Sequence, residues 1–219
     1  MRKTLNYLLM TLFFLAAACG KSRDKEVLIE NSEDSSTDFY WGDGKKHYLT
    51  RLDNRSFVLF RSSDREVLLS TLSAIGVETD NAKINEYGFG GVFDMSGEAA
   101  YSFMGYQWAD FNINHNSASE IPEVVYAAPY YSLPNNNYEF PLTNLLHVSL
   151  KKSGDITTLE KLAKEYNVGI IGRFSEMPLW YAVACTKESK GNALEVANSF
   201  YESGLFEEAS PAFISHGAH

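Results

Sequence analysis

Three consecutive stretches decide the fold: LLHVSL at residues 145–150, DITTLEKLAKEYNVGIIGRF at 155–174, and MPLWYAVACTKESKGNALEVANSFYESGLFEEASPAF at 177–213. Short apolar runs and helical periodicities alternate along them in the order strand, helix, strand, strand, helix, strand. This order predicts a split β-α-β unit of the ferredoxin-like kind, which we expect to span residues 142–213.

The first predicted helix begins at a capping box, in which Thr157 is followed three residues later by Glu160. Apolar residues then recur at helical spacing and form one stripe: Leu159, Leu162, Ala163 and Tyr166. Asn167 comes directly after the stripe and tolerates the left-handed conformation that stops a helix.

The second predicted helix covers residues 192–203, and Gly204 stands where a left-handed carboxy-terminal cap belongs. Its apolar face consists of four residues: Ala193, Val196, Ala197 and Phe200. Short apolar strands are expected at 168–174 and 179–185, separated by a turn at 175–178. A last strand is expected to begin at Leu205 and to end at Pro211, because proline cannot donate to a ladder.

Residues 39–131 are predicted to form a first folded unit. Gly42-Asp43-Gly44 predicts a β-hairpin, residues 56–61 a strand, 87–93 and 101–113 further strands, and 119–122 a rudimentary helix after a polar loop at 112–117. A capping box at Ser63 and Glu66 starts a helix that Gly76 stops. The apolar stripe of this helix is expected to be Val67, Leu68, Leu72 and Ile75.

The order of strand, capped helix and following valine in this unit is repeated in residues 142–213, which suggests a diverged internal duplication. The predicted fold class is therefore α+β, with two tandem ferredoxin-like units joined by a linker at 132–141. The glycines at 88, 90 and 91 are interpreted as a bulge or tight bend, since no helix pattern follows them as a phosphate loop requires.

The run MPLWYAVACTKESKGNALEVANSFYESGLFEEASPAF resembles the N-terminal pro-region of subtilisin-like serine proteases from Bacteroidales-type bacteria. FYWGDGKKHYLTRLDNRSFVLF near residue 39 and VVYAAPYYS near the middle resemble the start and midpoint of the same pro-region. In such precursors a catalytic domain follows, whereas this sequence ends six residues after Phe213.

Residues 1–19 have the pattern of a bacterial lipoprotein signal peptide. Arg2 and Lys3 precede an apolar segment at 8–15 that is too short to span a bilayer, and Leu15-Ala16-Ala17-Ala18-Cys19 is similar to a lipobox. We expect Cys19 to carry lipid and to anchor the protein to a membrane of the cell envelope; the alternative is a simple secretory signal. Residues 20–38 are polar and acidic and predict a disordered linker.

The net charge of −9 and the pI near 5.1 argue against a nucleic-acid partner, which requires a basic face. Cys185 ends an apolar strand and is interpreted as an inert buried thiol. Only His216 and His219 are spaced as metal ligands could be, and they lack partner carboxylates or thiols. We predict no cofactor, no metal and no catalytic residue, because the serine, histidine and aspartate motifs of the protease domain do not occur.

The resemblance implies binding instead of catalysis. In subtilisin-like precursors the pro-domain assists folding of the protease and then inhibits it, with its sheet on two enzyme helices and its tail in the substrate cleft as an added strand. The corresponding tail lies at 214–219 and contains Ser215, His216, Gly217, Ala218 and His219. Glu176, in the turn at 175–178, could cap a helix of the protease. The alternatives are a frayed tail and a solvated acidic turn, and Trp180 is expected to belong to the core.

Three functions remain open from the sequence. The first is a stand-alone pro-domain-like lipoprotein that inhibits a subtilisin-like protease or assists its folding. The second is a fragment or remnant of a longer protease precursor. The third is a surface lipoprotein used for adhesion or ligand capture.

Overall fold

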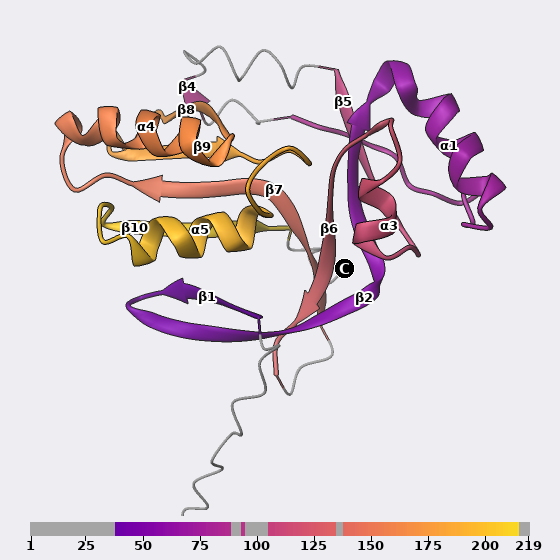
Figure 1. The fold of residues 1–219 in the computed structure, drawn as a ribbon, viewed down its shortest axis with the longest axis horizontal. Coiled ribbons are helices and arrows are strands. Elements are labelled where there is room, and N and C mark those ends of the chain that lie inside the picture. The colour runs from indigo at the N-terminus through magenta and orange to yellow at the C-terminus, as the bar shows by residue number, and fades with distance from the viewer. Residues whose placement is uncertain (1–37, 89–92, 95–104, 135–137, 215–219) are drawn as a thin grey trace, which may run out of the picture. The chain divides into compact units, whose positions relative to one another are not determined.

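The computed structural model describes residues 38–88, 93–94, 105–134 and 138–214. Over these residues the protein is of the α+β class, with a ten-stranded antiparallel sheet and the α-helices α1, α3, α4 and α5. The strands follow the order β3-β5-β2-β6-β7-β9-β8-β4, while β1 pairs with β2 and β10 pairs with β7 (Figure 1).

The C-terminal half of the sheet contains the three stretches at 145–150, 155–174 and 177–213. Its elements are β7 (Glu139–Ser149), α4 (Ile156–Tyr166), β8 (Gly169–Phe174), β9 (Trp180–Ala184), α5 (Ala193–Glu202) and β10 (Glu208–Phe213). The strands lie in the order β10-β7-β9-β8 and every neighbouring pair is antiparallel. The predicted succession of strand, helix, strand, strand, helix and strand is confirmed.

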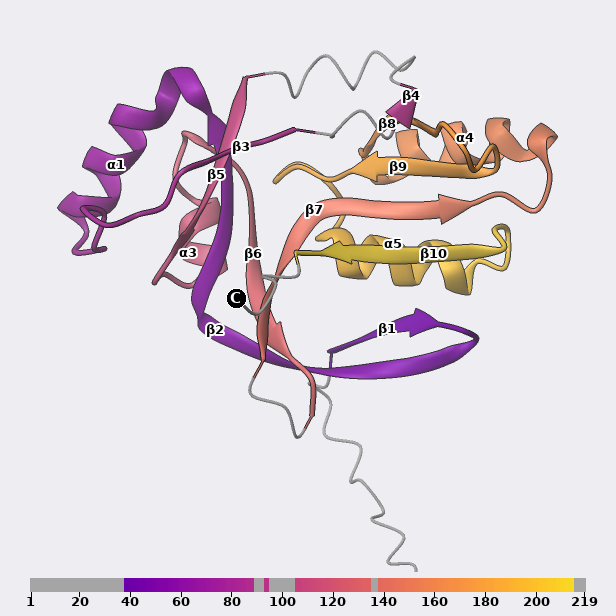
Figure 2. The same cartoon turned by 180° about the vertical axis from the view of Figure 1, so that it is seen from behind.

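Helices α4 and α5 lie together on one face of these strands. Figure 1 shows both helices in front of the sheet, and Figure 2 shows the strands in front of the helices. The ring of Tyr166 on α4 meets the ring of Phe200 on α5 edge to face, with centroids 5.3 Å apart. Leu159 and Ala163 of the first apolar stripe are buried, and so are all four residues predicted for the face of α5.

The carboxy-terminal end of α4 agrees with the sequence prediction, but its start does not. Asn167 has a φ of 54° and ends α4 in the left-handed conformation, as expected. A 3₁₀ turn, Ser153–Asp155, leads into α4, so that Asp155 takes the cap position and makes no side-chain cap hydrogen bond. The predicted capping box at Thr157 is therefore wrong, because the helix already begins one residue before it.

The N-terminal half of the sheet carries a second set of helices. Its elements are β1 (Asp38–Gly42), β2 (Lys45–Arg61), a 3₁₀ turn (Ser62–Asp64), α1 (Arg65–Ala74), β3 (Asn85–Glu86), β5 (Tyr106–Phe111), α3 (His115–Ser119) and β6 (Val124–Ser132). The strands lie in the order β3-β5-β2-β6, again antiparallel throughout. Buried residues of α1 and α3 share a core cluster with residues from β2, β5 and β6.

The second predicted capping box, at Ser63 and Glu66, is also not formed at the start of α1. The hydroxyl of Ser63 hydrogen-bonds to Asp64 Oδ1 at 3.0 Å, and the cap residue of α1 makes no side-chain cap hydrogen bond. Leu68 and Leu72 are buried as predicted, but Val67 and Ile75 are 54 % and 58 % exposed. Only two residues of α1 are therefore buried, whereas five are buried in α5, which has the same length.

Two local predictions differ from the structure, and a third lies largely outside the described residues. Of the strand predicted at 87–93, residues 89–92 are not described; β3 pairs with β5 just before the predicted start, and β4 (Phe93–Asp94) pairs with β8 at its end. The loop predicted at 112–117 contains the start of α3, which the Asn114 side chain caps by accepting from the Asn116 N–H. Pro211 lies inside β10 instead of ending it, since β10 pairs with β7 along only one edge in the described structure.

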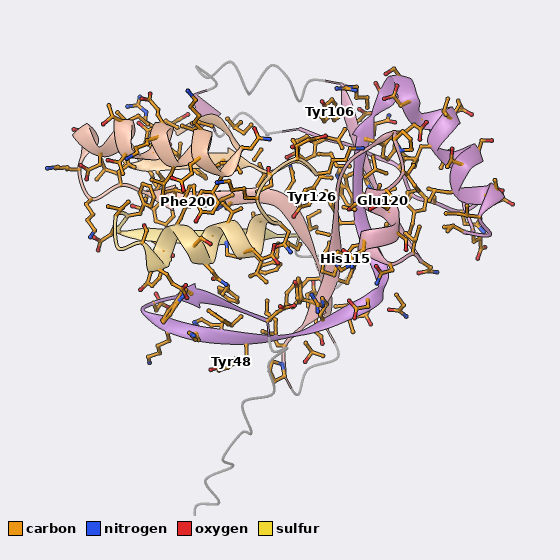
Figure 3. All side chains as sticks on the ribbon, in the orientation of Figure 1. Tyr48, Tyr106, His115, Glu120, Tyr126 and Phe200 are labelled. Carbon is orange, nitrogen blue, oxygen red and sulfur yellow. The ribbon has the colours of Figure 1, made fainter. Side chains whose placement is uncertain are left out.

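The two halves share a core. β6 and β7 pair from Tyr130–Pro141 to Ser132–Glu139, so the expected linker at 132–141 includes the ends of two paired strands. One cluster of buried residues combines Phe57, Leu59 and Tyr126 from the first half with Leu146 and Val196 from the second. The hydroxyl of Tyr126, which Figure 3 labels, donates to the Thr143 carbonyl at 3.1 Å and accepts from the Ala193 N–H at 3.1 Å.

Candidate functional site

The turn at 175–178, which carries Glu176, joins β8 to β9. The Met177 N–H donates to the Phe174 carbonyl and the Trp180 N–H to the Met177 carbonyl, at 3.3 and 2.9 Å. These two bonds form a tight turn in which Glu176 is exposed and Met177 is 44 % exposed. The turn therefore presents a carboxylate and an apolar thioether side by side to solvent.

Trp180 begins β9 directly after this turn. It is half-buried and packs against the main core, as does its neighbour Tyr181. Trp180 pairs with Ser149 of β7, and Ser149 pairs in turn with Glu208 of β10. The first residue of β10 thus lies at the same end of the sheet as the Glu176 turn.

The root of the predicted tail lies at the opposite end. β10 runs from Glu208 to Phe213, five residue steps, which corresponds to about 17 Å of strand. The structure therefore does not bring Glu176 and the start of the tail together. Cys19 and the tail residues Ser215, His216, Gly217, Ala218 and His219 lie outside the described residues.

A polar pocket of about 210 Å³ lies between α3, β6 and the start of α5, and sequence reasoning did not predict it. Its lining includes His115, Lys187 and Glu195 (Figure 3 labels His115). Burial lowers the pKa of His115, nearby Arg51 lowers it further, and Glu195 is among the acidic groups that oppose the shift. The only sequence signal for the pocket is the Asn-x-x-Glu cap at Asn192.

The start of α5 in this pocket is not an anion site. Asn192 Oδ1 accepts from the N–H groups of Leu194 and Glu195, at 2.9 and 3.1 Å. The Glu195 carboxylate accepts from the Asn192 N–H at 2.9 Å and places a negative charge at the same point. The donors that would hold a phosphate are therefore already used. The Lys187 ammonium donates to two backbone carbonyls, those of Ile121 and Pro122.

A second pocket, of about 340 Å³, includes Arg55, Glu78 and Asp110 in its lining. The Arg55 guanidinium lies 3.8 Å from the Asp110 carboxylate and 3.4 Å from that of Glu139. It also covers the ring of Tyr130 at 4.2 Å. The cation is thus compensated within the chain, and the arrangement fits a structural role in holding β2, β5 and β7 together.

Cys185 is fully buried, and burial raises the pKa of its thiol to about 12. A thiol that is protonated at neutral pH is a poor nucleophile and a poor metal ligand. Within the described part of the chain, no group of three or more His, Cys, Asp or Glu side chains is placed to hold a metal ion. The same residues include no helix long and apolar enough to cross a bilayer.

Comparison with known proteins adds no assignment. No protein-family model matches this chain, and no curated protein or solved structure shows significant similarity to it.

Proposed function

We propose that this chain is a non-catalytic lipoprotein that binds a subtilisin-like serine protease in the manner of a pro-domain, inhibiting the enzyme or assisting its folding. Lipid on Cys19 anchors it to a membrane of the cell envelope. No cofactor and no nucleic acid takes part. The proposal rests on the sequence resemblance over residues 39–213 and on the arrangement of the C-terminal half.

The observation that carries the proposal is the strand order β10-β7-β9-β8 with α4 and α5 on one face. Numbered from β7 in chain order, this is the order 4-1-3-2 with antiparallel neighbours, which supports the proposal of a ferredoxin-like split β-α-β unit. That arrangement leaves one sheet face free of the chain's own helices α4 and α5. A pro-domain of this kind uses such a face to dock on its protease.

The N-terminal half supports the duplication. Its strands β2, β3, β5 and β6 lie in the order β3-β5-β2-β6, which is the same 4-1-3-2 order read from the other edge. Helix α1 follows the first of these strands and α3 follows the third, as α4 and α5 do in the second half. We propose that both halves are ferredoxin-like units, the first of them diverged, with β1 and β4 added to the pattern.

Two contacts with the protease are proposed. Glu176 caps the start of an enzyme helix, because a carboxylate both accepts from free N–H groups and complements the helix dipole. The tail at 215–219 adds a strand in the substrate cleft, where backbone hydrogen bonds supply affinity. Glu176 and the root of the tail at Ile214 lie at opposite ends of the sheet.

The test is inhibition of a purified subtilisin-like protease, measured with a chromogenic peptide substrate. Removal of Ser215–His219 is expected to weaken inhibition, and unchanged inhibition would exclude the tail as a contact. Glu176→Gln is expected to raise Ki roughly tenfold, the value of one charge-assisted hydrogen bond. The control is Glu165→Gln, an exposed carboxylate on α4, which should leave Ki unchanged.

A further inference from the structure

The chain leaves β10 through a group of four aromatic rings, which we call the tail-root cluster: Tyr40, Tyr131, Phe140 and Phe213. The ring of Phe213 meets the other three edge to face, with centroid distances of 5.8 Å to Tyr40, 6.2 Å to Tyr131 and 5.0 Å to Phe140. Edge-to-face pairs have a preferred geometry, so three of them around one ring restrict its orientation.

The partners of Phe213 come from three different strands. Tyr40 belongs to β1 and Tyr131 to β6, so two of them lie in the N-terminal half. Phe140 belongs to β7. Tyr131 and Phe140 are 1 % and 8 % exposed, so both are buried and provide fixed packing surfaces for Phe213. The ring of Tyr40 also stacks on the ring of His47, with centroids 4.9 Å apart.

The backbone on both sides of Phe213 is also fixed. The Thr143 hydroxyl donates to the Ala212 carbonyl at 2.7 Å, where the register of β10 on β7 shifts between Pro211 and Phe213. The Ile214 N–H then donates to the Pro141 carbonyl at 3.2 Å. A register shift turns a strand, and these bonds hold the turned segment against β7.

The hairpin that supplies Tyr40 is itself clamped onto α5. The Trp41 ring stacks on Tyr201 at 5.0 Å, and Trp41 Nε1 donates to the Glu202 carboxylate at 3.0 Å. Two residues before Trp41 on β1, the Phe39 carbonyl accepts from Asn198 Nδ2 at 2.7 Å. The residues before and after Tyr40 therefore both contact α5 in the C-terminal half. The position of Tyr40 thus depends on the fold of the whole molecule.

We infer that the N-terminal half fixes the direction in which the chain leaves β10, and that Phe213 is the positioning residue through which it does so. The part of this inference that concerns the protease rests on the proposed function, because the tail is the segment proposed to enter the substrate cleft. The N-terminal half then serves as more than a spacer from the membrane. It holds Phe213 and Ile214, from which the tail starts, in place before binding, which reduces the ordering cost of association.

The first experiment measures inhibition of a purified subtilisin-like protease by the full chain. Phe213→Leu keeps an apolar side chain but removes the ring contacts, and Ki is expected to rise roughly tenfold, as the loss of edge-to-face pairs implies. Tyr40→Leu, in the other half, should act in the same direction. Phe213→Tyr keeps the ring and should retain Ki within about twofold.

A matched control separates positioning from stability. Ile113→Val lies in the core cluster beneath α1 and α3, away from the tail-root cluster, and removes one buried methylene. It should lower the unfolding midpoint without changing Ki. An unchanged Ki in Phe213→Leu, or an equal rise of Ki in Ile113→Val, would overturn the inference.

The second experiment needs no protease. Hydrogen exchange of the Ile214 amide should become several-fold faster in Phe213→Leu and in Tyr40→Leu, and remain at the wild-type rate in Ile113→Val. If the wild-type chain inhibits no subtilisin-like enzyme, the proposed function fails while this exchange result still decides the inference. Equal Ile214 exchange in all variants would overturn it.

Discussion

His147 lies in the middle of β7, paired with Ser210 of β10 on one side and with Ala182 of β9 on the other. Its ring meets Phe174 edge to face, with centroids 5.0 Å apart. Burial lowers the pKa of His147 below its ordinary value of 6.5, because the charged imidazolium loses hydration there. The sequence could not have predicted this shift, since it depends on which strands flank β7.

The shift makes stability depend on pH. When the folded pKa lies below the unfolded one, the unfolded chain binds a proton first as the pH falls, so the contribution of His147 to the free energy of unfolding decreases below about pH 6.5. We expect His147→Gln to reduce that decrease. Urea unfolding of both proteins above and below pH 6.5 measures it, and an identical pH dependence of the two would contradict the prediction.

At the scale of elements, the two capping boxes that the sequence predicts differ from the one that the structure shows at α5. Ser63 and Thr157 do not cap α1 and α4, because a 3₁₀ turn precedes each helix and shifts its start. At α5 the reciprocal pair between Asn192 and Glu195 is formed in full. The pattern alone does not distinguish the cases, because the conformation of the preceding residues decides which side chain reaches the free N–H groups.

This contrast gives a prediction for α5. Asn192→Ala should lower the free energy of unfolding by about 1 kcal/mol, because two helix N–H groups lose their acceptor. Thr157→Ala, an exposed residue in the first turn of α4, should change it by less than about 0.5 kcal/mol. Chemical denaturation of the two variants compares them directly, and equal losses would mean that the α5 box contributes nothing of its own.

At the scale of the whole molecule, the N-terminal half has one core cluster of its own under α1 and α3, while the C-terminal half has its core in a larger cluster that both halves share. Tyr126 on β6 is buried and hydrogen-bonds to Thr143 and Ala193 across the boundary. Burying one large apolar side chain contributes about 1.5–3 kcal/mol, while a domain has only about 5–15 kcal/mol of net stability. Loss of a few such contacts would therefore unfold either half by itself.

We accordingly expect one cooperative unfolding transition. Trp108 lies on β5 and Trp180 on β9, so each reports on one half. Two single-tryptophan proteins, each with the other two tryptophans replaced by phenylalanine, should show the same urea midpoint. Two distinct midpoints would show that the halves fold independently and that the shared core contributes little to stability.

The sequence by itself determined the order of elements in the C-terminal half, the buried faces of α4 and α5, the stop at Asn167 and the burial of Cys185. These follow from local periodicity and from single-residue conformational preference, which act over a few residues. Only the tertiary structure decided that the halves share a core and that Pro211 lies inside an edge strand. It also placed Phe213 among rings from β1, β6 and β7. Those features depend on strand pairing between residues far apart in the chain, where many registers satisfy the same local pattern and packing of the whole molecule selects one.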